Sequence, residues 1–235
     1  MGIVRRSIAF AGVMAILSFG LATTPAGLFG AALASGGGGC DGGGGTGPTP
    51  GPTQVFASHF SGLSAAASYT IFSGTTETDI AVDAFQGQAA LAVSGPTSIN
   101  DVFLTISVSD GGVPIFDAFG CASNPDFQIN QTLTSATLGL TSIQVTDLAS
   151  NTSTMATVSA AWAGTGDITR VTQTSAFHSG AFTNTMTFVS FDRFGVASGT
   201  VADQDLGISV DGPADFAELD KVNSGGVFVC VQGSC

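Results

Sequence analysis

The chain has 235 residues, with 17 Asp and Glu against 5 Lys and Arg, and its formal net charge is −12. This balance excludes nucleic-acid binding through the phosphate backbone, because that contact requires clustered Lys and Arg side chains. It also disfavours an anionic membrane surface as a partner. We therefore expect neither nucleic acid nor an anionic membrane as the partner, and predict an unidentified surface or extracellular partner.

The N-terminal segment predicts export. Arg5 and Arg6 precede an uncharged stretch over 7–40, and small residues at Ala32 and Ala34 precede Ser35. A basic start, an apolar stretch and an A-x-A-like end are the three parts of a secretory signal peptide. We therefore expect a signal peptide over 1–34 and a secreted or cell-surface protein. Its removal leaves 3 basic and 17 acidic residues, hence a net charge of 3 − 17 = −14.

Two other modes of anchoring compete with a cleaved signal. An uncleaved segment would act as a membrane anchor, since a span needs about 20 apolar residues, although Pro25, Gly27 and Gly30 interrupt the apolar run. Lipidation of Cys40 would attach the mature chain to a membrane. A lipobox normally has a Leu-like residue three positions before its Cys, and here that position is Gly37.

The composition changes again after the signal. Residues 35–53 are rich in Gly and then in Pro and Thr, which is typical of a disordered tether. Residues 54–235 are long enough for one domain. We expect no membrane insertion of this mature domain.

Alternating side chains predict strands through most of the domain. Thr78 to Ala84, Val102 to Val108 and Ala156 to Trp162 each place apolar residues at every second position, and 183–191 and 227–231 follow the same pattern. A period of two is typical of a strand with one buried face. The sequence therefore predicts an all-β fold: an antiparallel β-sandwich of roughly ten to twelve strands in two sheets.

Turn signals separate these runs, because Gly, Asn and Asp tolerate the positive φ of tight turns. The clearest signals lie at 110–112, 150–152, 211–213 and 223–226. The segment 214–222 is ambiguous, since it fits either a short helix or a strand before a final hairpin.

The aromatic residues suggest a core. We expect Trp162 to lie on the buried face of its strand, and we expect most of the core from a set of phenylalanines. Phe103 and Phe191 stand opposite their aliphatic neighbours, where we expect loops to cover them; a second packed surface or an interface is the alternative. The set comprises Phe56, Phe60, Phe72, Phe85, Phe103, Phe116, Phe188, Phe191 and Phe228.

The chain contains four cysteines, Cys40, Cys121, Cys230 and Cys235. In an exported protein they favour disulfides. Three pairings are possible, and the favoured one joins Cys121 to Cys230 or Cys235 and leaves the other for Cys40. A zinc site lacks the paired C-x-x-C spacing.

One acidic loop is a weak candidate for calcium. Asp203, Asp205 and Asp211 lie close together near Gly207, and carboxylate oxygens are the ligands that Ca²⁺ prefers. The EF-hand pattern is not met, so a solvated acidic loop is the simpler interpretation.

Candidate catalytic groups are few. His59 and His178 are the two histidines, and no G-x-S-x-G elbow accompanies them. Carboxylate pairs of the glycosidase type cannot be selected from spacing. We therefore expect a non-enzymatic module with an adhesive, binding or structural role. The alternatives are a secreted hydrolase that uses Asp/Glu or Ser chemistry, and a subunit that assembles through sheet edges.

Overall fold

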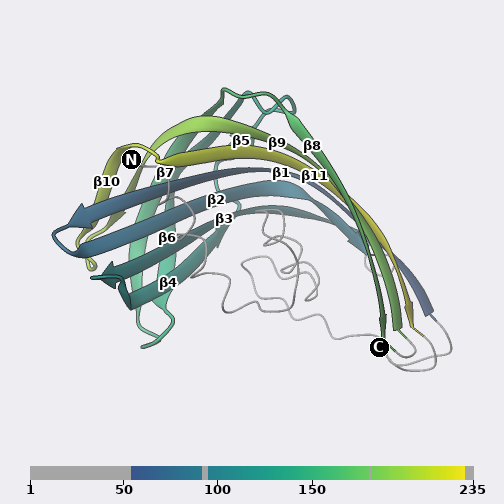
Figure 1. The fold of residues 1–235 in the computed structure, drawn as a ribbon, viewed down its shortest axis with the longest axis horizontal. Coiled ribbons are helices and arrows are strands. Elements are labelled where there is room, and N and C mark those ends of the chain that lie inside the picture. The colour runs from purple at the N-terminus through teal and green to yellow at the C-terminus, as the bar shows by residue number, and fades with distance from the viewer. Residues whose placement is uncertain (1–53, 92–94, 180–181, 231–235) are drawn as a thin grey trace, which may run out of the picture.

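The computed structural model describes residues 54–91, 95–179 and 182–230. These residues form eleven antiparallel strands and contain no helix, which confirms the all-β prediction (Figure 1). No helix within the described ranges is long and apolar enough to cross a membrane. The strands are β1 (Gln54–Ser73), β2 (Thr76–Leu91), β3 (Gly95–Asp110), β4 (Val113–Ser123), β5 (Phe127–Ile129), β6 (Ser135–Asp147), β7 (Ser153–Gly164), β8 (Thr169–Ser179), β9 (Phe182–Asp203), β10 (Ile208–Pro213) and β11 (Phe216–Cys230).

The long strand β9 organises the sheet. In its first half, residues 182–192 pair with β8 and residues 182–194 pair with β11. In its second half, residues 195–203 pair with β7 and residues 198–203 pair with β10. From β11 the pairings continue through β1, β2, β3, β4 and β6 to β7, which returns to β9. The strand pairings therefore close on themselves.

The predicted division into two sheets is not confirmed, because all eleven described strands belong to one sheet. The physical reason lies in strand length. β9 has 22 residues and β1 has 20, whereas strands of a sandwich are usually 3–10 residues long. One strand of this length pairs with the closed part of the sheet at one end and extends beyond it at the other.

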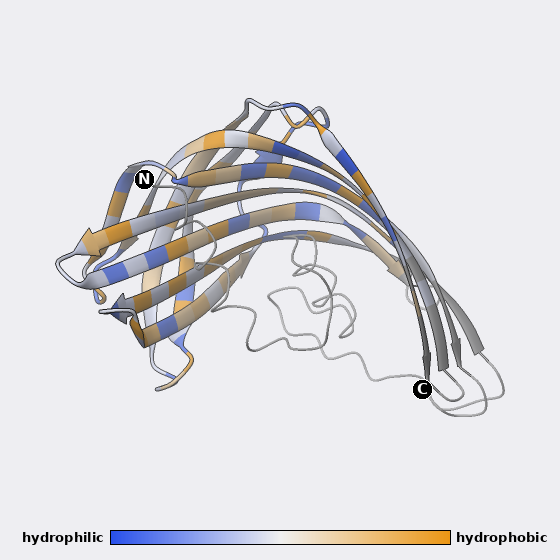
Figure 2. Cartoon of the chain, viewed as in Figure 1, coloured by the Kyte–Doolittle hydropathy of each residue, from blue (hydrophilic) through white to orange (hydrophobic). Residues whose placement is uncertain are grey.

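The core lies inside the closed part. Hydropathy alternates along the strands (Figure 2), and one face of most strands supplies buried Ala, Val, Ile and Leu side chains to a single cluster. Trp162 is 3% exposed and its indole Nε1–H donates to the carbonyl of Ala66 at 2.8 Å. The prediction that Trp162 belongs to the core is confirmed.

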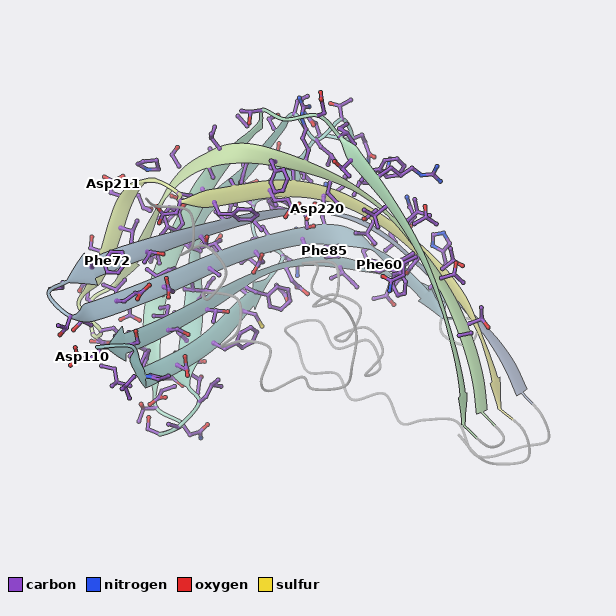
Figure 3. All side chains as sticks on the ribbon, in the orientation of Figure 1. Phe60, Phe72, Phe85, Asp110, Asp211 and Asp220 are labelled. Carbon is purple, nitrogen blue, oxygen red and sulfur yellow. The ribbon has the colours of Figure 1, made fainter. Side chains whose placement is uncertain are left out.

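The phenylalanine core is only partly confirmed. Phe60 and Phe85 are buried, but they form a small separate cluster with Val222. Phe116 and Phe191 pack against the main core, so loops are not what covers Phe191. Phe72 is 70% exposed, and its predicted place in the core is wrong (Figure 3). The side chains of Phe56 and Phe228 lie outside the described residues, and those of Phe103 and Phe188 are partly buried.

Two predicted turns are confirmed and two are wrong. Gly111, Gly112 and Asn151 have positive φ in tight turns. Residues 211–213 instead belong to β10, and 223–226 lie within β11. The ambiguous segment 214–222 is largely strand, and a final hairpin at 223–226 is absent from this part of β11.

Beyond the closed part, four strands continue as an extension. The registers carry β8, β9, β11 and β1 on to the row that joins Gln54, Cys230 and Phe182. β2 and β3 stop earlier, at Leu91 and Gly95. Figure 1 shows these strands curving away from the closed part. The junction of the extension and the closed part lies on β9 near residues 192–195, where the pairing with β8 ends and the pairing with β7 begins.

Candidate functional site

Two neighbouring rows of residues cross the sheet at the junction. In the first row, Asp192 of β9 pairs with Asp220 of β11, Asp220 with Ser64 of β1, and Ser64 with Phe85 of β2. The second row runs two residues further along each strand. Directly paired residues of an antiparallel sheet share a face, as do residues two apart on one strand. The side chains of both rows therefore lie on one face, opposite the core, which we call the acidic face.

The second row joins Phe194, Glu218, Ala66, Asp83 and Phe103. The two rows together bring Asp83, Asp192, Glu218 and Asp220 onto the acidic face from β2, β9 and β11. We call these four residues the carboxyl cluster. β1 lies between Asp83 and the other three residues. Asp83 is two strand spacings, or about 10 Å, from Glu218 and Asp220 on β11, and three spacings, or about 14 Å, from Asp192 on β9.

Burial and mutual repulsion raise the pKa values of the cluster. The pKa of Asp220 rises to about 9, first through burial and then through the charges of Glu218, Asp192 and Asp83. Burial and the charge of Asp192 raise the pKa of Glu218 to about 7. Burial raises the pKa of Asp83 to about 6 and also raises that of Asp192. The raised pKa values shift these groups toward the neutral form, because burial and neighbouring negative charge both disfavour ionisation.

Asp192 and Asp220 form a proton-sharing pair. They stand directly opposite each other, and a hydrogen bond between their carboxyl groups lowers the pKa of Asp192 and raises that of Asp220. Ser190 Oγ also donates to Asp192 Oδ2 at 3.3 Å. Asp220 is 7% exposed, and its Oδ1 is buried without a hydrogen-bond partner.

The basic side chains of the described residues lie on the opposite face. Lys221 is one residue from Asp220 and pairs with Leu63 of the core. Arg170 pairs with Phe191 and stands 5.9 Å above its ring. Arg193 donates from Nε to the Gly166 carbonyl at 2.8 Å. None of the three neutralises the carboxyl cluster.

Three aromatic pairs surround the carboxyl cluster on the same face. Phe194 and Phe216 meet edge to face with ring centroids 6.0 Å apart, and Phe194 is 60% exposed. Two further pairs are stacked. They are Phe60 with Phe85 at 5.3 Å and Phe103 with Phe119 at 6.0 Å. Figure 3 shows Phe60, Phe85 and Asp220 along the middle of the long strands. The acidic face thus combines carboxyl groups with aromatic rings.

The predicted calcium loop lies elsewhere, at the turn between β9 and β10. Asp203 is fully buried, and its Oδ1 accepts the backbone N–H groups of Asp205 and Leu206, both at 3.0 Å. Its Oδ2 accepts from Thr154 Oγ1. Asp205 and Asp211 are exposed. No three acidic, His or Cys residues in the described ranges are arranged to hold a metal ion, and calcium at this loop stays a prediction.

The histidines do not assemble a catalytic group within the described residues. His59 is exposed on the extension, where it pairs with Gly225 and Ala90. No hydrogen bond joins it to a described Ser or Asp side chain. The side chain of His178 lies outside the described residues.

The strand registers test one of the predicted disulfide pairings, that of Cys121 with Cys230. The row of Cys121 crosses β3 at Phe103, β2 at Asp83, β1 at Ala66 and β11 at Glu218. Cys230 is therefore 230 − 218 = 12 residues away along β11 and four strands away across the sheet. A disulfide needs Cα atoms within about 7 Å, so these registers disfavour the pairing of Cys121 with Cys230. Cys40 and Cys235 lie outside the described residues, and their pairing stays a prediction.

The sequence gives one partial signal for the carboxyl cluster. Glu218 and Asp220 are two residues apart in a segment that fits a strand as well as a short helix, and only a strand puts both side chains on one face. Asp83 and Asp192 join them only through strand pairings between distant segments. Comparison of the chain with protein-family models, curated proteins and solved structures finds no match.

Proposed function

We propose that this chain is an exported, non-enzymatic module that acts by binding a partner outside the cytoplasm. The signal-like segment over 1–34 and the tether-like composition of 35–53 support export. The acidic face supports binding. It gathers unneutralised carboxyl groups and aromatic rings on one side of a long sheet, and aromatic residues are enriched where proteins bind partners. The carboxyl cluster is the single observation that carries the binding role.

Export is tested by intact-mass analysis of the full chain expressed in a bacterial host. We expect the mass that starts at Ser35 in the fraction outside the cytoplasm. A chain that lacks residues 2–34 is the control and remains in the cytoplasm. Recovery of the full-length mass in the cytoplasm alone would contradict the proposal. A lipid on Cys40 would appear as a mass increase and would replace a free protein with an anchored one.

A hydrolase is the second candidate, and the Asp192–Asp220 pair favours it. Two Asp carboxyl groups that share one proton activate water in some hydrolases. The pair is unsuited to glycosidase chemistry, because that chemistry needs carboxyl groups about 5 Å or more apart, whereas these two are hydrogen-bonded. Asp220 is also buried, which restricts access to a substrate.

Activity is tested with casein and with nitrophenyl esters, assayed from pH 3 to pH 9. We expect no release above that of an Asp192→Asn/Asp220→Asn double variant. Hydrolysis that the double variant loses, while it keeps the wild-type circular dichroism spectrum, would favour the hydrolase over the binding module.

A further inference from the structure

Strand β8 is an edge strand along its whole length. Within the described residues its 11 positions, from Thr169 to Ser179, pair with β9 alone and without a register shift. β7 lies on the same side of β9 and is covered by β6, but that pairing starts at Ser135 and Ala163, so β6 does not reach β8. The outward N–H and C=O groups of β8 are therefore a template for another strand.

Both faces of β8 are exposed as well as its edge. Every side chain of β8 that the structure describes is exposed to solvent, and this includes the apolar Val171, which is 41% exposed. An incoming strand therefore reaches the edge without displacing a described element. These side chains are Thr169, Arg170, Val171, Thr172, Gln173, Thr174 and Ala176.

The other described edges carry features that block strand pairing. Pro96 lies where β3 extends beyond β4, Pro114 lies where β4 extends beyond β6, and Pro213 ends the 6-residue strand β10. A proline has no N–H to donate to a neighbouring strand. β5 has only 3 residues, and β1 is unpaired on one side only over 54–57. In contrast, β8 contains no proline, no glycine and no acidic residue.

A second copy of the chain fits this edge. The prolines disfavour the joining of β8 to β3, β4 or β10 of another copy, which leaves β8 against β8. Antiparallel pairing of two identical edges is an isologous contact, so it closes as a dimer and occupies both edges. The chain is strongly acidic and copies repel each other, but β8 adds no acidic residue to such a contact.

The sequence of β8 is self-complementary about Gln173. With a two-fold axis at Gln173, antiparallel pairing sets Thr172 of each copy opposite Thr174 of the other. Pairs of threonines across strands stabilise a sheet. Thr174 already makes such a pair with Thr187 of β9, where the two hydroxyl oxygens are 3.3 Å apart. The same type of contact would therefore repeat on the outer side of β8.

We infer that two copies of the chain pair through β8, antiparallel about Gln173, and join their extensions into one continuous sheet. In this register Arg170 lies opposite Ala176 of the other copy, so the two guanidinium groups do not face each other. Each closed part lies beyond the start of β8 (Figure 1), so the antiparallel direction places the two closed parts at opposite ends of the shared sheet. The inference goes beyond the proposed binding function and does not depend on it.

The test is the molar mass measured by light scattering after size-exclusion chromatography, over a wide range of protein concentration. The sample is the protein as the bacterial host of the export experiment delivers it. We expect a monomer–dimer equilibrium that shifts toward the dimer as salt rises, because salt screens the repulsion between two acidic copies. Amide hydrogen exchange in β8 slows in the dimer, since its outward N–H groups become bonded. A monomer at every concentration would overturn the inference.

Charge variants at the two-fold axis identify the surface. Gln173→Lys and Gln173→Glu each place like charges opposite each other across the axis, and each raises the dissociation constant of the dimer by about tenfold or more. A mixture of the two variants forms a heterodimer, because opposite charges then face each other. Gln173 is exposed, so both variants keep the wild-type circular dichroism spectrum.

Thr97→Lys and Thr97→Glu are the matched controls. They make the same changes of charge at an exposed position on the edge of β3, and they leave the dimer unchanged. Dimers that the Gln173 variants do not weaken, equal weakening by the Thr97 variants, or no heterodimer in the mixture would each overturn the inference. All variants share one N-terminus, so association through residues 1–53 would give the first of these results.

Discussion

The two faces of the sheet at the junction of closed part and extension differ in kind, although single residues separate them along each strand. On the core face, Val82, Leu219 and their neighbours are fully buried in one aliphatic cluster. On the acidic face, Asp83, Glu218 and Asp220 alternate with those same residues. Apolar burial stabilises the fold on the first face, while the second face retains buried acids that stability alone does not favour.

The difference between the faces indicates which residues have a role beyond folding. A core residue is selected by packing, so another apolar side chain of similar volume is tolerated at its position. A buried, unpaired carboxyl group costs stability and is retained only where the cost is offset, for example by a ligand. The four predictions that follow test this division, from the largest expected effect to the smallest.

The largest loss of stability is expected when a carboxylate is introduced on the core face. Val82→Asp places a carboxylate in the fully buried core, where an unpaired charge costs several kcal/mol. We expect loss of the cooperative urea transition, followed by circular dichroism. Asp83→Asn, one residue away on the acidic face, is the matched control and retains a wild-type transition. Similar loss in both variants would remove the distinction between the faces.

The next prediction concerns the sign of a change on the acidic face. Replacing Asp220 with Asn keeps the shape of the side chain and a donor toward Asp192, and it removes the ionisable group. We expect Asp220→Asn to raise the free energy of unfolding at pH 8 by about 2 kcal/mol, since the wild-type carboxyl group stays protonated in the fold, with a pKa of about 9, although it ionises at this pH in the unfolded chain. Chemical denaturation of wild type and variant at pH 5 and pH 8 measures it.

The pH dependence follows from the raised pKa values. A carboxyl group whose folded pKa exceeds its unfolded pKa binds more protons in the folded state, so its contribution to stability is lost as pH rises. For Asp220 the window runs from about 4 to about 9. Glu218 of β11 and Asp83 of β2, with pKa values of about 7 and about 6, titrate within it. Asp192 of β9, whose pKa burial also raises, and Asp101 of β3 share the face. A flatter profile in the variant supports this assignment, and parallel profiles contradict it.

Particular residues show how far the sequence predicts such a molecule. Alternation from Thr78 to Ala84 predicts β2 and its buried face, because side-chain period depends on local geometry alone. The Asn151 turn is equally local. The aromatic set misleads at Phe72, because burial depends on what a strand end packs against. A hydrophobic side chain at such an end has no second layer to cover it.

The carboxyl cluster illustrates what sequence does not predict. The pairing of Asp192 with Asp220 depends on the register between β9 and β11, and that of Glu218 with Ala66 on the register between β11 and β1. A shift of one residue in either register would move each acid to the core face. The division into two sheets failed for a similar reason, since periodicity gives the face of a strand but not its partner.

A smaller loss of stability is expected when Gly62, which lies against the ring of Phe85, is replaced by Ala. A Cβ atom added at Gly62 would overlap the edge of that ring, so Gly62→Ala must displace it at a cost of about 1–2 kcal/mol. Ser61→Ala, on the other face, is the control and changes stability by less than about 0.5 kcal/mol. A double-mutant cycle with Phe85→Leu measures the coupling, because the smaller side chain relieves the overlap. Additive effects would show that the ring is not the cause.

The smallest effect is expected at Phe72, where the sequence predicts core and the structure shows exposure. The side chain is 70% exposed at the end of β1, so Phe72→Ser removes little buried area. We expect a change in the free energy of unfolding within about 0.5 kcal/mol. A phenylalanine truncated in a core costs about 3–5 kcal/mol. Phe60→Ser, at 7% exposure on the acidic face, is the comparison and shows the larger loss. Equal losses at Phe72 and Phe60 would mean that a packed surface covers both.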